Sequence, residues 1–322
     1  MIFTDLINWA ITQQASDIHL SPNKSVWLRC QGKMCEYADK KFSTQELNQF
    51  FKSMLNPEQA TALQQQNYLD IANSPIEGIR LRINLFQQLQ GLSAVIRIVP
   101  QEIPTLTELA APKVIYEFIR EHQGLILVTG PTGSGKSTTL AAMIAEINQS
   151  TAKHILTLED PIEFIHPAQK SLITQRECHT HFQDYPHALR SALREDPDVI
   201  LIGELRDAET IQLALTAAET GHLVLATLHT RTAASTVNRI IEVFAGEKQT
   251  LVRQLLADTL VAVISQRLIT KTHKRQAIFE ILRATPAVRQ LIREQNTSQL
   301  ITAMQTGAAH GMQVFQELTP CN

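Results

Sequence analysis

Short, mainly apolar runs recur through the second half of the chain, and each is followed by a cluster of polar residues or glycines. These runs cover residues 125–128, 154–158, 198–202 and 223–227. Stretches of helical character, such as 138–147 and 207–220, lie between them. Apolar runs of this length that alternate with helices predict βα units, so we expect an α/β domain with an open, mainly parallel sheet.

The first hundred residues follow a different pattern. Apolar positions at helical spacing predict a helix over 2–13, and Ser43 with Glu46 forms a capping box that predicts a second helix to about Leu55. A third helix is expected to start at Pro57. Alternation and turn signals predict strands over 16–20, 26–30, 34–37, 79–85 and 93–99. Together these elements predict a small α+β domain.

Two prolines, Pro100 and Pro104, follow the last of these strands. Because proline does not easily continue a strand or a helix, we place the domain boundary here. The sequence therefore predicts an α+β domain over 1–99, a linker over 100–111 and an α/β domain over 112–322.

The apolar run that ends at Val128 leads into the strongest motif of the chain, Gly-Pro-Thr-Gly-Ser-Gly-Lys-Ser at 130–137. Its glycines permit a tight turn that points backbone N–H groups inward, and the helix that follows adds the positive end of its dipole. Lys136 would reach the β- and γ-phosphates of a nucleotide, and Ser137 would offer its hydroxyl to Mg²⁺. A glycine-rich surface loop is the alternative, which the flanking strand and helix disfavour. The residues expected to bind the nucleotide are Gly130, Pro131, Thr132, Gly133, Ser134, Gly135, Lys136, Ser137 and Thr138.

The polar clusters beyond the other apolar runs are expected to lie beside this loop. Ligands of open parallel sheets bind outside the carboxyl ends of the strands, and these clusters follow the strand ends directly. They contain Glu159, Asp160 and Glu163 after the second run, Glu204 after the third and His229 after the fourth.

Phosphoryl transfer to water requires positioned phosphates, Mg²⁺ ligands and a group that orients or deprotonates the attacking water. Many P-loop ATPases carry Asp-Glu at the end of one strand, and here Gly203 stands at the position of that Asp. Glu204 is therefore expected to act on the nucleophile. The acid on the metal side must come from elsewhere, and Glu159, Asp160 and Glu163 are the best placed. For each acid, a plain surface position or turn remains the alternative.

Two histidines, His222 and His229, bracket one strand and are seven residues apart. With an odd spacing on a strand they point to opposite faces, so at most one is expected to face the γ-phosphate. His229 lies beyond the carboxyl end and is the better candidate for a γ-phosphate sensor. His222 is equally compatible with a core or interface histidine.

Composition narrows the function classes. The chain has 322 residues, a formal net charge of −2 and no basic excess that would favour nucleic acid as the main partner. It has no apolar run of the roughly 18 residues that a membrane helix needs and no signal region, so we expect a cytoplasmic protein. Its four cysteines fit a reducing compartment. Cys178 and the histidines at 179 and 181 suggest a metal only weakly, and a solvated loop is favoured.

Four segments in combination resemble the Walker A, Asp-box, Walker B and His-box motifs of the secretion ATPase superfamily. They are residues 130–137, 157–164, 193–204 and 220–230. Within the superfamily the chain is most similar to the PilT-type retraction ATPases of type IV pili. Residues 286–294 resemble their retraction signature, and residues 16–20 resemble their N-terminal strand. The similarity spans nearly the whole chain.

The resemblance implies a PAS-like N-terminal domain and a RecA-like P-loop domain, assembled as a ring homohexamer with ATP and Mg²⁺ bound between the domains and near the next subunit. It implies a motor that hydrolyses ATP to power pilus retraction at the cytoplasmic face of the inner membrane. Such a motor would dock on an inner-membrane platform protein, associate with the membrane only through its partners, and bind no nucleic acid.

The resemblance also assigns a role to three arginines, Arg80, Arg82 and Arg97, which match family positions that approach the phosphates across a domain or subunit boundary. A guanidinium there would neutralise transition-state charge, so hydrolysis would depend on domain closure. On residue patterns alone, a solvated sheet face is the alternative. The catalytic group is thus predicted to comprise Glu204, Glu163, His229, Arg80, Arg82 and Arg97, with Ser137, Glu159 and Asp160 holding Mg²⁺ partly through water.

Departures from the family pattern leave alternatives open. The four-cysteine zinc segment of pilus-extension and type II secretion ATPases does not occur before residues 277–281, which favours the retraction branch. Gln90 stands where the family usually has arginine, and the chain stops at Asn322, so we expect the last helical turns of the family to be absent. A non-retracting accessory paralogue that binds nucleotide is one alternative. A nucleic-acid translocase on the same core is another.

Overall fold

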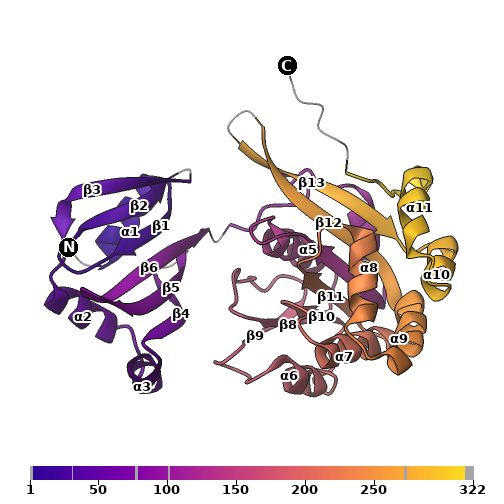
Figure 1. Ribbon diagram of the computed structural model, residues 1–322, viewed down its shortest axis with the longest axis horizontal. Coiled ribbons are helices and arrows are strands. Elements are labelled where there is room, and N and C mark those ends of the chain that lie inside the picture. The colour runs from indigo at the N-terminus through magenta and orange to yellow at the C-terminus, as the bar shows by residue number, and fades with distance from the viewer. Residues whose placement is uncertain (1–2, 31, 77–78, 101, 272–273, 316–322) are drawn as a thin grey trace. The chain divides into compact units, whose positions relative to one another are not determined.

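The computed structural model describes residues 3–30, 32–76, 79–100, 102–271 and 274–315, which form two compact units (Figure 1). The first unit runs to Glu102 and the second starts at Ile103. This boundary falls inside the interval 100–111, and Leu106 is already buried in the core of the second unit.

The first unit is a six-stranded antiparallel sheet with three helices. Its strands lie in the order β3-β2-β1-β6-β5-β4. The strands are β1 Ala15–Leu20, β2 Ser25–Cys30, β3 Lys33–Lys41, β4 Tyr68–Ile76, β5 Ile79–Gln88 and β6 Gly91–Pro100. The helices are α1 Phe3–Thr12, α2 Thr44–Lys52 and α3 Pro57–Gln66. The predicted helices and strands are present, and β4 is an additional strand that the sequence pattern did not predict.

Local sequence signals explain several of these elements. The capping box at the start of α2 is formed as predicted, because Ser43 N donates to Glu46 Oε2 at 2.7 Å and Glu46 N donates to Ser43 Oγ at 3.2 Å. In β5 the side chains of Leu81, Ile83 and Leu85 are fully buried, while the residues between them lie on the other face. The predicted period-two alternation of this strand is therefore confirmed.

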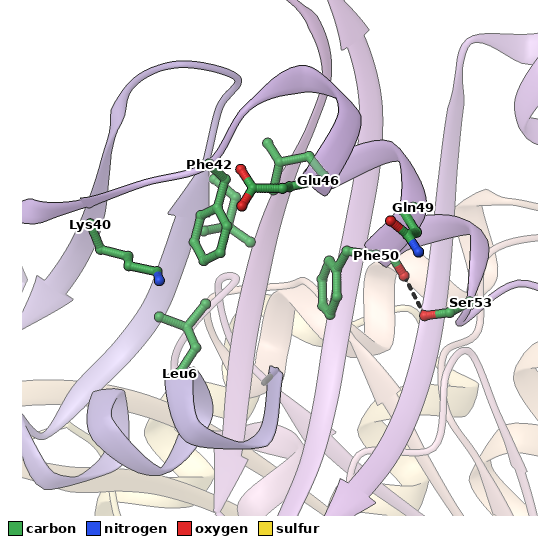
Figure 2. Close-up of a pocket in the computed structure, with 9 residues that line it drawn as sticks. Leu6, Lys40, Phe42, Glu46, Gln49, Phe50 and Ser53 are labelled. Carbon is green, nitrogen blue, oxygen red and sulfur yellow. Dashed lines mark hydrogen bonds between the residues drawn. The ribbon is translucent and has the colours of Figure 1, made fainter. Parts of the chain in front are cut away.

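A cavity of about 330 Å³ lies within the first unit, between α1, α2 and the end of β3 (Figure 2). Leu6 on α1 points toward Phe42, and Lys40, Glu46 and Phe50 also line the cavity (Figure 2). All the residues that line it belong to the first unit, and none belongs to the glycine-rich loop at 130–137.

The second unit is a seven-stranded sheet between two layers of helices. Its order is β13-β12-β7-β11-β10-β8-β9, and only the β12–β13 pair is antiparallel. Its strands are β7 Gly124–Thr129, β8 His154–Glu159, β9 Leu172–Glu177, β10 Val199–Ile202, β11 Leu223–Leu228, β12 Leu260–Lys271 and β13 Lys274–Arg283. Its α-helices are α4 Val114–Phe118, α5 Lys136–Ser150, α6 Tyr185–Ala192, α7 Ala208–Glu219, α8 Ala233–Glu242, α9 Gly246–Thr259, α10 Pro286–Arg293 and α11 Leu300–Thr306.

Alternate residues of the central strands face the two helical layers. Ile126 and Val128 of β7 pack with α4 and α5, whereas Leu125 and Leu127 pack in the core formed with α6 to α11. A parallel strand covered on both faces is apolar throughout, which is why these runs do not alternate in sequence. The predicted α/β fold with a mainly parallel sheet is confirmed, and it brings the carboxyl ends of β7, β8, β10 and β11 to one edge.

Candidate active site

The glycine-rich segment at 130–137, called the phosphate loop below, joins β7 to α5 at this edge. Gly135 is the N-cap of α5 and provides no side-chain cap, so the first N–H groups of the helix stay available to an anion. Gly130 and Gly135 adopt φ angles of 149° and 89°, which side chains rarely tolerate. A Cβ on Gly130 would also lie 2.3 Å from the carbonyl oxygen of Gln266. Only glycine fits at position 130, and the loop conformation is compatible with the predicted phosphate cradle.

The loop is braced from behind by a buried glutamine on β12. Gln266 is 2% exposed; its Nε2 donates to Ser134 O at 2.8 Å, and its Oε1 accepts from Thr139 Oγ1 at 2.7 Å. The Ser134 hydroxyl is buried in the loop and makes no hydrogen bond within the described part of the chain. A buried hydroxyl without a partner at the cradle fits a site that is completed by a polar ligand.

Lys136 extends from the first turn of α5 back over the loop. Its Nζ donates to Gly130 O at 2.9 Å and to Pro131 O at 3.3 Å, and lies 3.5 Å from His229 Nδ1. Burial lowers the pKa of Lys136, while the nearby Glu204 and Glu163 carboxylates act in the opposite direction. Lys136 therefore lies close to Glu204 and Glu163 and contacts His229. These are the three catalytic side chains that the sequence predicts in this unit.

Glu204 lies directly beyond β10 and is held at both oxygens. His229 Nε2 lies 2.9 Å from Glu204 Oε1, and Arg206 Nε donates to Glu204 Oε2 at 2.9 Å. These side chains line a hollow of about 330 Å³ together with Arg239 of α8. Lys136, His229 and Glu204 thus form one chain of contacts. His222 lies at the other end of β11, just before the strand begins, and its Nδ1 is 2.9 Å from Ala217 O.

Glu159 ends β8 and Asp160 and Glu163 follow it, and these three acids occupy different environments. Glu159 accepts hydrogen bonds from Thr157 Oγ1 at 2.7 Å and Gln175 Nε2 at 3.3 Å, and burial raises its pKa to about 7. Asp160 lies farther out, with its Oδ2 3.7 Å from Arg206 Nη1. Glu163 is the member of this group whose charge acts on Lys136.

The donor set at this edge suits Mg²⁺. Ser137 is exposed in the first turn of α5, after β7, whereas the acids at 159, 160 and 163 lie at and beyond the end of β8, and β11 and β10 lie between these two strands. Glu163 connects the two places, because its charge acts on Lys136 at the start of α5. Ser137 and the three acids are all oxygen donors, the ligands that Mg²⁺ takes together with substrate phosphates and water. The composition of the site therefore fits the metal that the sequence predicts.

Gly203 is enclosed by its neighbours. A Cβ at this position would lie 2.9 Å from Tyr185 Oη, 3.3 Å from Leu158 O and 3.4 Å from Glu159 Cα. Tyr185 is part of α6, and burial raises the pKa of its hydroxyl, with Asp160 acting in the same direction. A side chain at position 203, aspartate included, would therefore require Tyr185 to move and would crowd the backbone at the end of β8.

Sequence reasoning missed four side chains of this region. They are Tyr185, Arg206, Arg239 and Gln266. It also expected a solvated loop after β9, which is wrong for Cys178. This residue is 8% exposed and belongs to the hydrophobic core of the second unit, and its N–H donates to Glu159 O at 2.8 Å.

The three predicted arginines belong to the first unit. Arg80 and Arg82 lie on the polar face of β5, and Arg82 is directly opposite Arg97 of β6. Arg97 Nε donates to Asp17 Oδ1 at 2.9 Å, with its side chain 62% exposed. Burial raises the pKa of Asp17, but the bonds from Arg97 and Ser16 outweigh it and the net pKa is lowered. That these arginines approach a nucleotide stays a prediction.

Among the described residues, no helix is both long enough and apolar enough to cross a membrane.

Comparison with known proteins gives a consistent result. The family described as type II/IV secretion system protein matches residues 1–318. The chain is 51% identical to a twitching motility protein of Neisseria gonorrhoeae over 294 residues, covering 90% of this chain and 78% of the relative. It is 45% identical to the type IV pilus retraction ATPase PilT of Pseudomonas aeruginosa over 316 residues, covering 98% and 92%. A crystal structure of the pilus retraction motor PilT with bound ADP superposes with a TM-score of 0.90 at 41% identity, covering 95% and 90%.

Proposed function

The chain belongs to the type II/IV secretion system protein family, and from this premise we propose that it is an Mg²⁺-dependent ATPase that drives retraction of a type IV pilus. The observation that carries the proposal is the chain of contacts from Lys136 through His229 to Glu204 beside an open phosphate cradle. Relatives named for pilus retraction and twitching motility match nearly the whole chain, which supports the same filament for this protein.

In the proposed mechanism, the backbone N–H groups of 130–137 bind the phosphates and Lys136 leaves its loop carbonyls for the β/γ oxygens. Mg²⁺, held by Ser137, Glu159 and Asp160 partly through water, would supply charge neutralisation on the phosphates. Glu204 orients the attacking water and accepts its proton.

Three further side chains complete the proposed reaction. His229 touches both Lys136 and Glu204, so it can report the presence of the γ-phosphate to the base. Arg82 and Arg97 would reach the phosphates from the first unit of the same or a neighbouring subunit, and they would stabilise transition-state charge on closure. Hydrolysis would then be coupled to domain movement.

We propose a homohexameric ring that works at the cytoplasmic face of the inner membrane. Family relatives include a retraction motor, and closure against a neighbouring subunit gives a ring a means to transmit force. The proposed partner is an inner-membrane platform protein, with no direct membrane or nucleic-acid contact.

Deletion of the gene tests the filament assignment. A retraction motor predicts more surface pili and loss of twitching, with both restored by the wild-type gene but not by Lys136→Gln. Normal pilus number and twitching in the deletion strain would instead favour a non-retracting accessory paralogue. Turnover stimulated by DNA in the purified protein would favour a nucleic-acid translocase.

A further inference from the structure

Arg206 is a side chain to which no motif assigned a role. It lies between β10 and α7, two residues beyond Glu204, and its Nε donates to Glu204 Oε2 at 2.9 Å. Its Nη1 lies 3.7 Å from Asp160 Oδ2, an ion-pair separation. One guanidinium therefore bridges the carboxylates that follow two neighbouring strands, β8 and β10.

The Glu204 carboxylate is held from two directions. His229 Nε2 lies 2.9 Å from Oε1, while Arg206 contacts Oε2. A glutamate side chain that is free to rotate populates several staggered rotamers. Charge-assisted contacts on both oxygens select one of them and fix the plane of the carboxylate. Arg206 thus sets the orientation of this group as well as its electrostatic surroundings.

We propose that Arg206 is a positioning residue for ATP hydrolysis, which holds the Glu204 carboxylate in the orientation that acts on the attacking water, with Asp160 anchoring the guanidinium on its other side. This inference rests on the proposed role of Glu204. Arg206 acts through Glu204 and needs no contact with the nucleotide.

A simple surface ion pair is the competing explanation, and it makes a different prediction. The side chains of Arg206 and Asp160 are 60% and 30% exposed, and exposed ion pairs contribute little to folding stability. If Arg206 forms only a surface ion pair, its replacement should change neither kcat, nor nucleotide affinity, nor unfolding. A positioning residue predicts lower kcat with unchanged nucleotide affinity and unchanged unfolding.

Lysine provides a graded variant at this position. The flat guanidinium offers several donors in a fixed plane, so it reaches Glu204 and Asp160 at once. An ammonium group is a point charge that satisfies one of these carboxylates at a time. Arg206→Lys should therefore recover part of the activity that Arg206→Gln loses.

The test measures kcat, KM and nucleotide affinity for the full chain and its variants with Mg-ATP. We expect Arg206→Gln to lower kcat by about 10- to 100-fold with unchanged nucleotide affinity, because a misplaced base costs turnover. Arg206→Lys should be intermediate. Made in the Glu204→Gln background, Arg206→Gln should add less than about a twofold loss, since residues that act as a unit are not additive. Arg190→Gln is the matched control, since Arg190 pairs with Glu209 on the exposed surface of α6 and α7.

An unchanged kcat for Arg206→Gln, or an equal loss in the wild-type and Glu204→Gln backgrounds, would overturn the inference. A loss in nucleotide affinity as large as the loss in kcat would overturn it as well. If Glu204→Gln turned over as fast as wild type, the role of Glu204 and this inference would both fall. A Glu204-dependent enzyme that is indifferent to Arg206 would overturn this inference alone.

Discussion

Glu159 is a carboxyl group enclosed at the end of β8. Burial raises its pKa from 4.5 to about 7, against the hydrogen bonds from Thr157 and Gln175. Between these two pH values the folded state binds more protons than the unfolded state. The contribution of Glu159 to stability is therefore fully present below pH 4.5 and is lost as the pH rises through about 7.

Glu159→Gln should remove this pH dependence. Glutamine keeps an oxygen for Thr157 and Gln175 but does not titrate. Relative to wild type, the free energy of unfolding of the variant should rise by up to about 3 kcal/mol between about pH 5 and about pH 8. Urea unfolding at both pH values measures the difference, with the exposed Glu219→Gln as the control. Parallel pH profiles of wild type and variant would show that Glu159 ionises normally.

The Tyr185 hydroxyl leaves little room for a side chain at Gly203. Gly203→Ala would place a Cβ 2.9 Å from Tyr185 Oη, and we expect it to destabilise the fold by about 1–3 kcal/mol through overpacking. Tyr185→Phe removes the obstructing oxygen, so the double variant should regain most of the loss. Urea unfolding of the two single variants and the double variant tests this. A double variant no more stable than Gly203→Ala would contradict the explanation.

At the scale of elements, α10 is clamped to the end of α9. Arg289 donates to the carbonyl oxygens of Ala257 and Asp258, the latter at 2.6 Å, and Arg293 binds the Asp258 carboxylate. The last carbonyls of a helix lack intrahelical partners and attract cations. The arginines of the segment that resembles the retraction signature thus connect two helices.

Arg289→Ala should leave these carbonyls without a donor. We expect it to lower the free energy of unfolding by about 1–2 kcal/mol, the cost of losing partly buried charged hydrogen bonds. Gln290→Ala, on the exposed side of the same helix, is the control and should have little effect. Equal stability of the two variants in thermal unfolding would argue against the clamp.

Some strands could be predicted from the sequence and others could not. Apolar runs such as those of β7 and β11 have a strong local signal, and both were predicted. β9 was missed because this edge strand, Leu172–Glu177, is mixed in polarity and not strongly buried, so its order comes from pairing with β8.

The same distinction applies to the site. Glu204 and His229 were predicted because they directly follow apolar strands. The contact of Gln266 with Ser134 joins residues 132 positions apart, and no local pattern reveals it. Tyr185 and Arg206 likewise acquire their positions only from packing.

At the scale of the whole molecule, the family predicted from four motifs was confirmed by a match over residues 1–318. The proposed active site needs arginines from the first unit. Arg97→Ala should lower kcat by about 10³-fold, as expected for an arginine that stabilises the transferred phosphoryl group, with little change in ATP binding. Steady-state turnover and equilibrium binding of the nucleotide measure the two effects.

Mixing variants tests whether the arginine acts between subunits. If each site combines Glu204 of one subunit with Arg97 of the next, rings assembled from Glu204→Gln and Arg97→Ala subunits contain some complete sites. Turnover should then exceed the sum of the two variants measured alone. A mixture that gains nothing would place Arg97 in the same subunit as the base, or outside the site.

In the proposed mechanism, Glu204 acts on the attacking water beside a nucleotide held by the phosphate loop. The most direct measurement is ATP turnover by wild type and Glu204→Gln, with ATP binding measured on the same samples. We expect the variant to bind ATP with similar affinity and to lose turnover by about 100-fold or more. Equal turnover of the two proteins would show that Glu204 does not act on the attacking water.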